Sequence, residues 1–277
     1  MRCALLQLCA SDDPAENLIA VRDMLRDAAE QGAQFVLTPE VTNCVSTSRA
    51  HQTAVLHLPE DDPTLHALQA EAAELGIWVL IGSLAVKTGD PDGRFANRSY
   101  LIDSSGDVRA HYDKIHMFDV TIDATETYHE SKGYRPGARA VVADTPFGRL
   151  GLSICYDMRF PQLYQSLARA GATILTAPSA FSPVTGAAHW HSLLRARAIE
   201  TGCFMLAPAQ TGTHASSTGK TRSTYGHSLV VDPWGEVLLD AGTEPGVYIF
   251  DLEPKKVDDA RRRVPSLSNA CEFANPE

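Results

Sequence analysis

Residues 151–161, GLSICYDMRFP, read as a buried β-strand that stops abruptly at a cysteine. Small and apolar residues lead to Cys155, and Tyr156, Asp157 and Arg159 follow within a few positions. Ligand sites in open α/β sheets gather at the ends of strands, so a thiol in this place is a candidate nucleophile. A lone cysteine after an apolar run is nevertheless most often a small core residue, and the rest of the chain has to decide.

Two further strand-like stretches end in a charged side chain. The stretch FVLTPE ends in Glu40, and VRAHYDK ends in Lys114. Taken singly, the glutamate is most simply a solvated cap and the lysine a surface charge that pairs with Asp113. Together with Cys155 they supply a carboxylate, an ammonium and a thiol, which are the groups that one reaction needs.

The chemistry of such a set is specific. The thiolate rather than the thiol is the nucleophile, and a nearby carboxylate can take the thiol proton as the attack begins. A lysine offsets the repulsion between carboxylate and thiolate and donates hydrogen bonds to the oxygen of a tetrahedral intermediate. The backbone N–H of Tyr156 would be the second donor. The set therefore suits a substrate with an electrophilic carbon bonded to nitrogen.

A unit of helix followed by buried strand recurs along the chain. Asp13 and Asp62 each precede a proline, and glycines close the two helical stretches, which is typical of capped helices. A looser copy starts at Pro161. The predicted helices cover 14–32, 63–76 and 161–171, and the strands that follow them lie in AQFVLTPE, IWVLIGSLAV and ATILTAPSA.

Hairpins interrupt this pattern. SYLIDSSGDVRAHYDK, ARAVVADTPFGRLGLSICYD and HSLVVDPWGEVLLD each hold two strand-like runs around a glycine-containing turn. A purely parallel sheet would lack them, so we expect mixed sheets with helices on their outer faces. About ten strands exceed what one twisted sheet carries comfortably, and two packed sheets are therefore predicted.

Composition narrows the class of protein. The 277 residues suffice for a single α/β domain over 1–277, with 261–277 as a possible C-terminal arm. Lys and Arg total 24 against 34 Asp and Glu, and the net charge of −10 argues against a nucleic-acid or anionic-membrane surface. The six cysteines show no C-x-x-C spacing, which favours reduced thiols in a cytoplasm over disulfides or a zinc site.

The chain resembles the nitrilase superfamily of carbon–nitrogen hydrolases from residue 2 to about residue 252. The stretches that carry the resemblance are LTPEVTN, YDKIHMFDV, GLSICYDMRFPQLY, PSAFSPVTGAAHWHSLLRARAIETGCF and STYGHSLVVDPWGEVL. The resemblance implies a four-layer αββα sandwich of two mixed sheets, paired through its helices into a homodimer or larger homo-oligomer, with no metal or organic cofactor. It places the family's Glu–Lys–Cys triad on Glu40, Lys114 and Cys155, and its second glutamate on Glu130.

Residues for substrate binding are less clearly marked. Arg159 lies four positions after the nucleophile and is suited to grip a substrate carboxylate, or it forms a structural pair with Asp157. Phe181 is either a wall of the binding cavity or core, and Thr185 is either a polar contact or part of a helix entry. His189 and His191 point in different directions on a helix, so we expect no metal there.

Within the superfamily, CYDMRFP, AHWHSLLRARAIE and YGHSLVVDPWG resemble the small-acid amidases, which include those of deaminated glutathione and the ω-amidases of 2-oxoglutaramate. A small 2-oxo acid amide is therefore the expected substrate. A nitrilase or an N-carbamoyl amidohydrolase with the same triad remains an alternative, as does a binding protein on an inactive scaffold. His116 would suggest a Cys–His protease, but such an enzyme would not need Lys114 and Glu40 at the ends of predicted strands.

Overall fold

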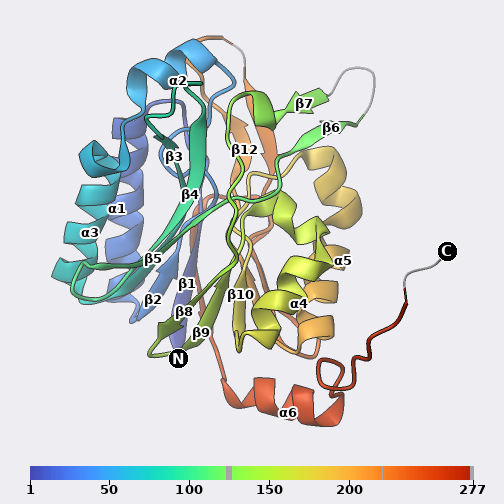
Figure 1. Ribbon diagram of the computed structural model, residues 1–277. Coiled ribbons are helices and arrows are strands. Elements are labelled where there is room, and N and C mark those ends of the chain that lie inside the picture. The colour runs from blue at the N-terminus through green and yellow to red at the C-terminus, as the bar shows by residue number, and fades with distance from the viewer. Residues whose placement is uncertain (123–126, 220, 275–277) are drawn as a thin grey trace.

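Two six-stranded β-sheets face each other, and helices cover both outer faces (Figure 1). The computed structural model describes residues 1–122, 127–219 and 221–274. The first sheet has the strand order β16-β1-β2-β3-β4-β5. Its strands are β1 (Arg2–Gln7), β2 (Phe35–Leu37), β3 (Trp78–Lys87), β4 (Phe95–Ile102), β5 (Val108–Asp113) and β16 (Gly246–Asp251).

The second sheet has the order β15-β14-β11-β10-β9-β8. Its strands are β8 (Val141–Thr145), β9 (Gly148–Leu152), β10 (Ile174–Thr176), β11 (Phe204–Ala207), β14 (Leu229–Val231) and β15 (Val237–Asp240). Two small hairpins lie outside the sheets, and they consist of β6 (Asp119–Thr121), β7 (Thr127–His129), β12 (Thr211–His214) and β13 (Arg222–Tyr225). Both sheets mix parallel and antiparallel pairs, as the sequence predicted.

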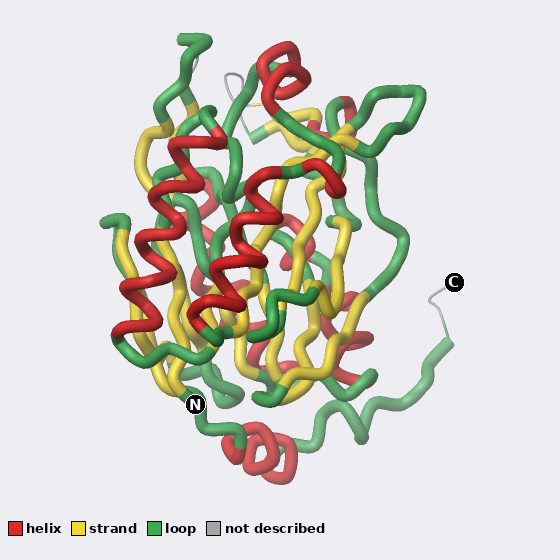
Figure 2. The backbone as a smooth tube through the Cα atoms, turned by 90° about the vertical axis from the view of Figure 1, so that its left-hand side faces the viewer, coloured by secondary structure: helices red, strands yellow, loops and turns green. Residues whose placement is uncertain are grey.

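The helices complete the four layers. In Figures 1 and 2, α1 and α3 cover the first sheet, and Figure 1 shows α4 and α5 against the second. The helices are α1 (Pro14–Glu30), α2 (Arg49–Val55), α3 (Pro63–Leu75), α4 (Pro161–Arg169), α5 (Pro183–Thr201) and α6 (Lys255–Arg263), with short 3-10 turns η1 (Pro59–Asp61), η2 (Glu130–Lys132) and η3 (Cys155–Arg159). None of the helices in the described ranges is both long and apolar enough to cross a bilayer.

The two sheets share one topology. The step from β1 through α1 to β2 and through α3 to β3 is matched by β9, α4, β10, α5 and β11, and both triplets are parallel. An antiparallel hairpin extends each triplet on one side, and one antiparallel strand closes the other side. Parallel triplets of this kind bring strand ends, where ligand sites gather, to one edge of the molecule.

Alternation along the strands divides the core into layers. Cys3 and Leu5 of β1 belong to the cluster that also contains the inner face of the second sheet, whereas Ala4 and Leu6 pack toward α1 and α3. Successive side chains of a strand point to opposite faces, so a strand that is buried on both faces has apolar residues at successive positions. The sandwich is therefore held together chiefly by the cluster between the sheets.

Local signals in the sequence mark the helix ends well. Asp13 accepts from Ala15 and Glu16 N–H, and Asp62 accepts from Leu65 N–H, so both aspartates are N-caps. Gly76 ends α3 in the left-handed conformation, with φ 65°. The strands after α1 and α4 are shorter than the predicted stretches, since β2 has only Phe35–Leu37 and β10 only Ile174–Thr176, whereas β3 after α3 runs over Trp78–Lys87.

The C-terminal segment begins differently from the prediction of an irregular tail from residue 261. Arg261 to Arg263 form the last turn of α6, and Arg261 donates to the Thr201 and Ala172 carbonyls. The chain then continues without regular structure as far as residue 274 (Figure 2). Leu267 still packs against the main core cluster, and the Ser266 hydroxyl donates to the Glu200 carbonyl. The last three residues of the predicted arm, 275–277, lie outside the described residues.

Candidate active site

Glu40, Lys114 and Cys155 converge at the end of the sandwich where β2, β5 and β9 finish. Lys114 directly follows β5, whereas Glu40 and Cys155 each come three residues after their strands. All three side chains are at least nine-tenths buried. Lys114 Nζ lies 3.0 Å from Glu40 Oε1, and the Cys155 thiol is hydrogen-bonded to Glu40. Three groups that are spread over more than a hundred positions of the chain therefore meet in one place.

Glu130 completes an ionic cluster around the lysine. Both of its carboxylate oxygens lie 2.9 Å from Lys114 Nζ, and Oε2 also accepts from the Phe118 N–H at 2.6 Å. Burial opposes the charge on Lys114, but Glu130 and Glu40 raise its pKa well above the ordinary value. The lysine is therefore held in place as an ammonium group between two carboxylates.

Glu40 is fixed on every side. Asn97 Nδ2 donates to Oε1 at 2.8 Å, and the Ala180 N–H donates to Oε2 at 2.8 Å. Burial works against ionisation, yet Lys114, with help from Arg222, holds the pKa of Glu40 below its usual range. The carboxylate is thus ionised and faces the thiol as a base.

Cys155 occupies a strained backbone position. Its φ of 48° lies in the left-handed region, which is uncommon for a residue with a Cβ. The Cys155 N–H donates to the Pro178 carbonyl at 3.0 Å. Burial and the negative charge of Glu40 raise the pKa of the thiol, against the effect of Lys114. The resting pair is therefore a thiol and a carboxylate, with the proton on sulfur.

Asp157 joins the segment that bears the nucleophile to the segment that bears the lysine. It is fully buried and accepts from the Ile154 N–H, the Tyr112 hydroxyl and the His116 N–H. The His116 ring lies 2.7 Å from the same carboxylate, so its contact is with Asp157. A shared carboxylate of this kind fixes two chain segments relative to each other.

A cavity of about 790 Å³ opens onto the three side chains. Tyr156, Phe181 and Thr185, which the sequence singled out, all line it. Phe181 is buried and packs on Trp190 with ring centroids 5.1 Å apart, so it is both wall and core. Thr185 lies in the first turn of α5. The volume is in the range typical of binding sites for small organic molecules.

Arg159 is placed differently from the rest of the predicted set. It is absent from the cavity lining, and its guanidinium lies over the rings of Tyr156 and Phe181 at 5.9 and 5.5 Å. Its hydrogen-bond contact is with His189 at 3.3 Å, not with Asp157. Its part in substrate binding stays a prediction.

The alternative pairing of Lys114 with Asp113 is not found, because Asp113 binds Arg98 with two hydrogen bonds. The stretch 119–134 contains Glu130, and its elements β7 and η2 contribute residues to the lining of the cavity. Residues 123–126 of this stretch lie outside the described residues.

Two residues of the site were missed by sequence reasoning. Asn97 and Arg222 both line the cavity, and both act on Glu40. Asn97 sits inside the strand β4 and Arg222 at the start of β13, where neither follows an apolar strand end. No signal in the sequence separates them from ordinary strand residues.

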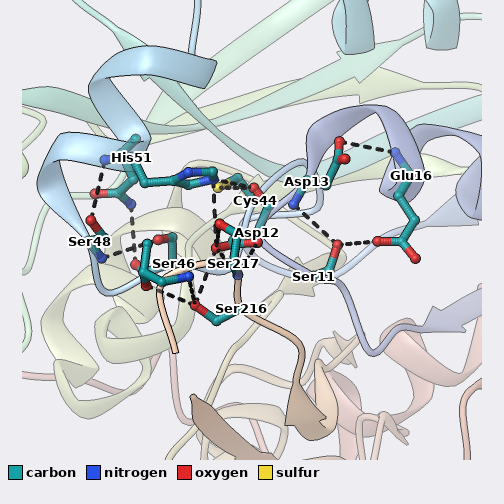
Figure 3. A network of polar contacts seen from close by, with 12 residues as sticks. Ser11, Asp12, Asp13, Glu16, Cys44, Ser46, Ser48, His51, Ser216 and Ser217 are labelled. Atoms are coloured by element: carbon teal, nitrogen blue, oxygen red, sulfur yellow. Dashed lines mark hydrogen bonds and ion pairs between the residues drawn. The ribbon is translucent and has the colours of Figure 1, made fainter. Parts of the chain in front are cut away.

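Asp12, a buried carboxylate, links the segment after β12 to the segment that contains the cavity residue Cys44 (Figure 3). It accepts from the N–H and hydroxyl of Ser217 at 2.9 and 2.8 Å, and from the Ser216 hydroxyl. Burial opposes its ionisation, but the donors of Ser217 hold its pKa below the ordinary value. The Asp12 backbone carbonyl contacts Cys44, in the loop after β2, and His51, on α2.

His189 and His191 do not form a common site. Among the described residues, one group of three side chains could hold a metal ion, namely His191, His227 and Asp240, whose ligand atoms lie within 4.8 Å of one another. Each oxygen of Asp240 already contacts one imidazole nitrogen at 2.8 Å. These ion pairs account for the group, and none of its members lines the cavity.

Comparison with known proteins identifies the family. Residues 2–262 match the family Carbon-nitrogen hydrolase. The chain belongs to this family. The carbon–nitrogen hydrolase described here is 43% identical over 268 residues to the deaminated glutathione amidase of Yersinia enterocolitica, an alignment that covers 96% of this chain and 91% of the relative. It is 38% identical to the protein of the same name from Rattus norvegicus, covering 95% of this chain and 80% of the relative.

Solved structures agree with this assignment. The Caenorhabditis elegans NitFhit protein superposes with a TM-score of 0.88 at 35% identity, over 97% of this chain and 64% of that longer chain. The amidase from Nesterenkonia sp. AN1 superposes with a TM-score of 0.77 at 28% identity, over 96% of this chain and 98% of that chain. In that structure, of a glutamate-to-glutamine mutant, acrylamide has added to the active-site cysteine. The chain is thus an amidase-type enzyme of the nitrilase superfamily, as the sequence predicted.

Proposed function

We propose that this carbon–nitrogen hydrolase cleaves the amide bond of deaminated glutathione, or of a close 2-oxo acid amide, through a thioester on Cys155. The observation that carries the proposal is the meeting of Glu40, Lys114 and Cys155 in one buried site that opens onto the cavity. Relatives that match nearly the whole chain are named deaminated glutathione amidase, which supports the substrate class.

The first half-reaction uses the resting protonation of the site. Glu40 takes the proton from the Cys155 thiol as sulfur attacks the amide carbon, and the carbonyl oxygen becomes an oxyanion. Lys114 and the Tyr156 N–H donate to this oxygen. The intermediate then collapses, the carbon–nitrogen bond breaks, and protonated Glu40 gives its proton to the leaving amine. The acyl group remains on sulfur.

The second half-reaction returns the enzyme to its starting state. Glu40, now a carboxylate again, takes a proton from a water molecule that attacks the thioester carbon. The tetrahedral intermediate releases the carboxylic acid, and the proton on Glu40 returns to the sulfur. Glu130 does not take part in proton transfer in this scheme. Its two contacts with Lys114 Nζ fix the direction in which the ammonium points.

The size of the cavity favours a substrate with a large leaving group. Deaminated glutathione carries a dipeptide on the amine side of the cleaved bond, whereas 2-oxoglutaramate releases only ammonia. A cavity of about 790 Å³ has room for the larger molecule with the reacting carbon at Cys155. The ω-amidase activity is therefore the second candidate, and nitriles and N-carbamoyl acids are the further alternatives.

The test is a panel of substrates with the wild-type enzyme and Cys155→Ala. We expect the highest kcat/KM with deaminated glutathione, a lower value with 2-oxoglutaramate, and little turnover of nitriles and N-carbamoyl acids. Cys155→Ala should fold normally and be inactive, and mass spectrometry of briefly exposed wild type should show the acyl group on Cys155. Full activity of Cys155→Ala would disprove the mechanism, and a preference for nitriles or N-carbamoyl acids would disprove the substrate class.

A further inference from the structure

Three buried polar atoms of the described residues lack a hydrogen-bond partner and also belong to residues that line the cavity. They are Asn97 Oδ1, Thr185 Oγ1 and Arg222 Nε. A buried donor or acceptor without a partner costs about 1–3 kcal/mol. Protein interiors rarely tolerate this, and three such atoms around one cavity suggest that a ligand supplies the missing partners.

Arg222 is the cation among them. Its Nη2 donates to the Ala180 carbonyl, and its guanidinium lies 5.9 Å from the centre of the Tyr128 ring. Both residues belong to segments that border the cavity, since Ala180 and Tyr128 also line it. The hydrogen bond to Ala180 fixes one edge of the guanidinium, and Nε is left with a proton to donate.

The charge on Arg222 already has one explanation, because it lowers the pKa of Glu40. That effect requires a charge near Glu40, but it does not require a buried Nε without an acceptor. A guanidinium presents several N–H groups in a plane, and a carboxylate is the group that matches this arrangement. A hydroxyl such as that of Thr185 can donate to the same ligand.

We propose that Arg222 and Thr185 bind a carboxylate group of the amide substrate and so select anionic over neutral amides. This inference rests on the proposed function. The charge balance of the site agrees with it, because Glu40 and Glu130 would repel an anionic substrate from the lysine that they surround. Arg222 offsets this repulsion on the substrate side of Glu40.

The hairpin that carries Arg222 is held firmly. His214 of β12 is paired in register with Arg222 of β13, and its ring contacts the Ala10 carbonyl and the Thr224 hydroxyl. Asp12 binds Ser216 and Ser217, which follow β12 (Figure 3). An anchor fixed before the substrate arrives loses little conformational entropy when it binds.

The first test measures binding to Cys155→Ala protein, which cannot turn the ligand over. Three probes share a five-carbon acyl chain: pentanamide is neutral, 5-amino-5-oxopentanoate carries a carboxylate on the acyl side, and N-pentanoylglycine carries one on the amine side. We expect one of the two anionic probes to bind more tightly than pentanamide. Arg222→Met should weaken that probe about 10- to 100-fold, and Thr185→Val about 3- to 10-fold.

The controls separate a bound carboxylate from a general effect of charge. Arg109→Met removes an equal charge from an exposed arginine that does not line the cavity and should leave all three affinities unchanged. Arg222→Met should leave pentanamide binding within about twofold, because pentanamide has no carboxylate. Equal weakening of all probes would mean that Arg222 acts only through Glu40 or the fold, and the inference would be wrong.

Other outcomes also overturn it. The inference fails if neither anionic probe binds more tightly than pentanamide, or if Arg159→Met rather than Arg222→Met removes the preference. Its failure is distinguishable from failure of the proposed function, which is judged by the acyl group on Cys155 in wild-type protein. The adduct could form in wild-type protein while Arg222→Met still binds an anionic probe more tightly than pentanamide. In that case the proposed function would stand and the inference about Arg222 would be wrong.

Discussion

Asp157 shows how much of the site depends on a residue that never faces the substrate cavity. Its carboxylate accepts from the segment before Cys155 and from the segment around Lys114, and it is absent from the cavity lining. A displacement of about 1 Å in a catalytic group can cost 10²-fold in rate. Asp157 is therefore a positioning residue.

Asp157→Asn replaces one accepting oxygen with a donor that faces other donors. We expect the free energy of unfolding to fall by about 2–3 kcal/mol, because buried N–H or O–H groups lose their acceptor. We also expect kcat to fall more than KM rises. Urea unfolding and steady-state kinetics measure the two effects. Asp144→Asn, at an exposed carboxylate, should change stability by less than about 0.5 kcal/mol. Wild-type kcat in a folded Asp157→Asn would contradict the positioning role.

At the scale of residues, the sequence predicted those catalytic side chains that lie at the ends of strands. Glu40, Lys114 and Cys155 each come at the end of a predicted strand, and the rule that sites form at strand ends predicted that they meet. Arg222 and Asn97 could not be found this way, because the hydrogen bond from Asn97 to Glu40 and the effect of the Arg222 charge on Glu40 arise only in the folded chain. Local sequence carries no record of such contacts.

The β12–β13 hairpin links stability to pH through His214. Burial, with help from the charge of Arg222, lowers the pKa of His214 to about 4, although the Ala10 carbonyl acts in the opposite direction. In the unfolded chain the pKa of this histidine is about 6.5, so between about pH 6.5 and about pH 4 the unfolded state binds a proton that the folded state does not bind. The stability from neutral His214 is complete above that pH and is lost as the pH falls toward about 4.

Between about pH 7 and about pH 5, this residue should reduce the free energy of unfolding by about 2 kcal/mol. His214→Asn, which does not titrate, should be less stable at neutral pH but should lack this part of the pH dependence. Urea unfolding of both proteins at the two pH values measures the difference. An equal change in the two proteins would show that His214 does not titrate as described.

At the scale of elements, capping residues and turn glycines predicted the helices and hairpins well. Asp13, Asp62 and Gly76 act through contacts within one turn, which is the range that a local pattern can report. The lengths of β2 and β10 were overestimated, since each has three residues, whereas the predicted stretches continue over 38–40 and 177–180. Where a strand ends is decided by tertiary contacts.

At the scale of the whole molecule, the largest buried cluster among the described residues lies between the two sheets. Leu5, Leu37 and Leu80 of the first sheet belong to the same buried cluster as Leu152 and Leu206 of the second. The sheets should therefore unfold together as one domain, as the sequence predicted.

Two tryptophans can report on this. Trp78 lies on β3 of the first sheet and Trp190 on α5 over the second. Variants that keep only one of these tryptophans, with the others changed to Phe, should show the same urea midpoint by fluorescence once differences in stability are allowed for. Two separate transitions within one variant, or an intermediate seen by only one probe, would show that the halves unfold independently.

Assembly is the second prediction at this scale. The resemblance implies a homodimer or larger homo-oligomer paired through helices, and α5 exposes about half of Ile199 next to Gly235 and the half-exposed Trp234. We expect a dimer by analytical ultracentrifugation and a shift to monomer with Ile199→Glu. Ile19→Glu, at an equally open position on α1, should leave the dimer intact. Wild-type sedimentation as a monomer would contradict the prediction.

The left-handed backbone at Cys155 bears on the history of the chain. A residue with a Cβ at φ 48° costs about 1–2 kcal/mol, whereas glycine adopts this conformation freely. In a lineage that had stopped hydrolysing amides, mutations to glycine here would relieve this strain at no loss of fitness. A cysteine at so unfavourable a backbone position is therefore expected where its thiol is used in the reaction.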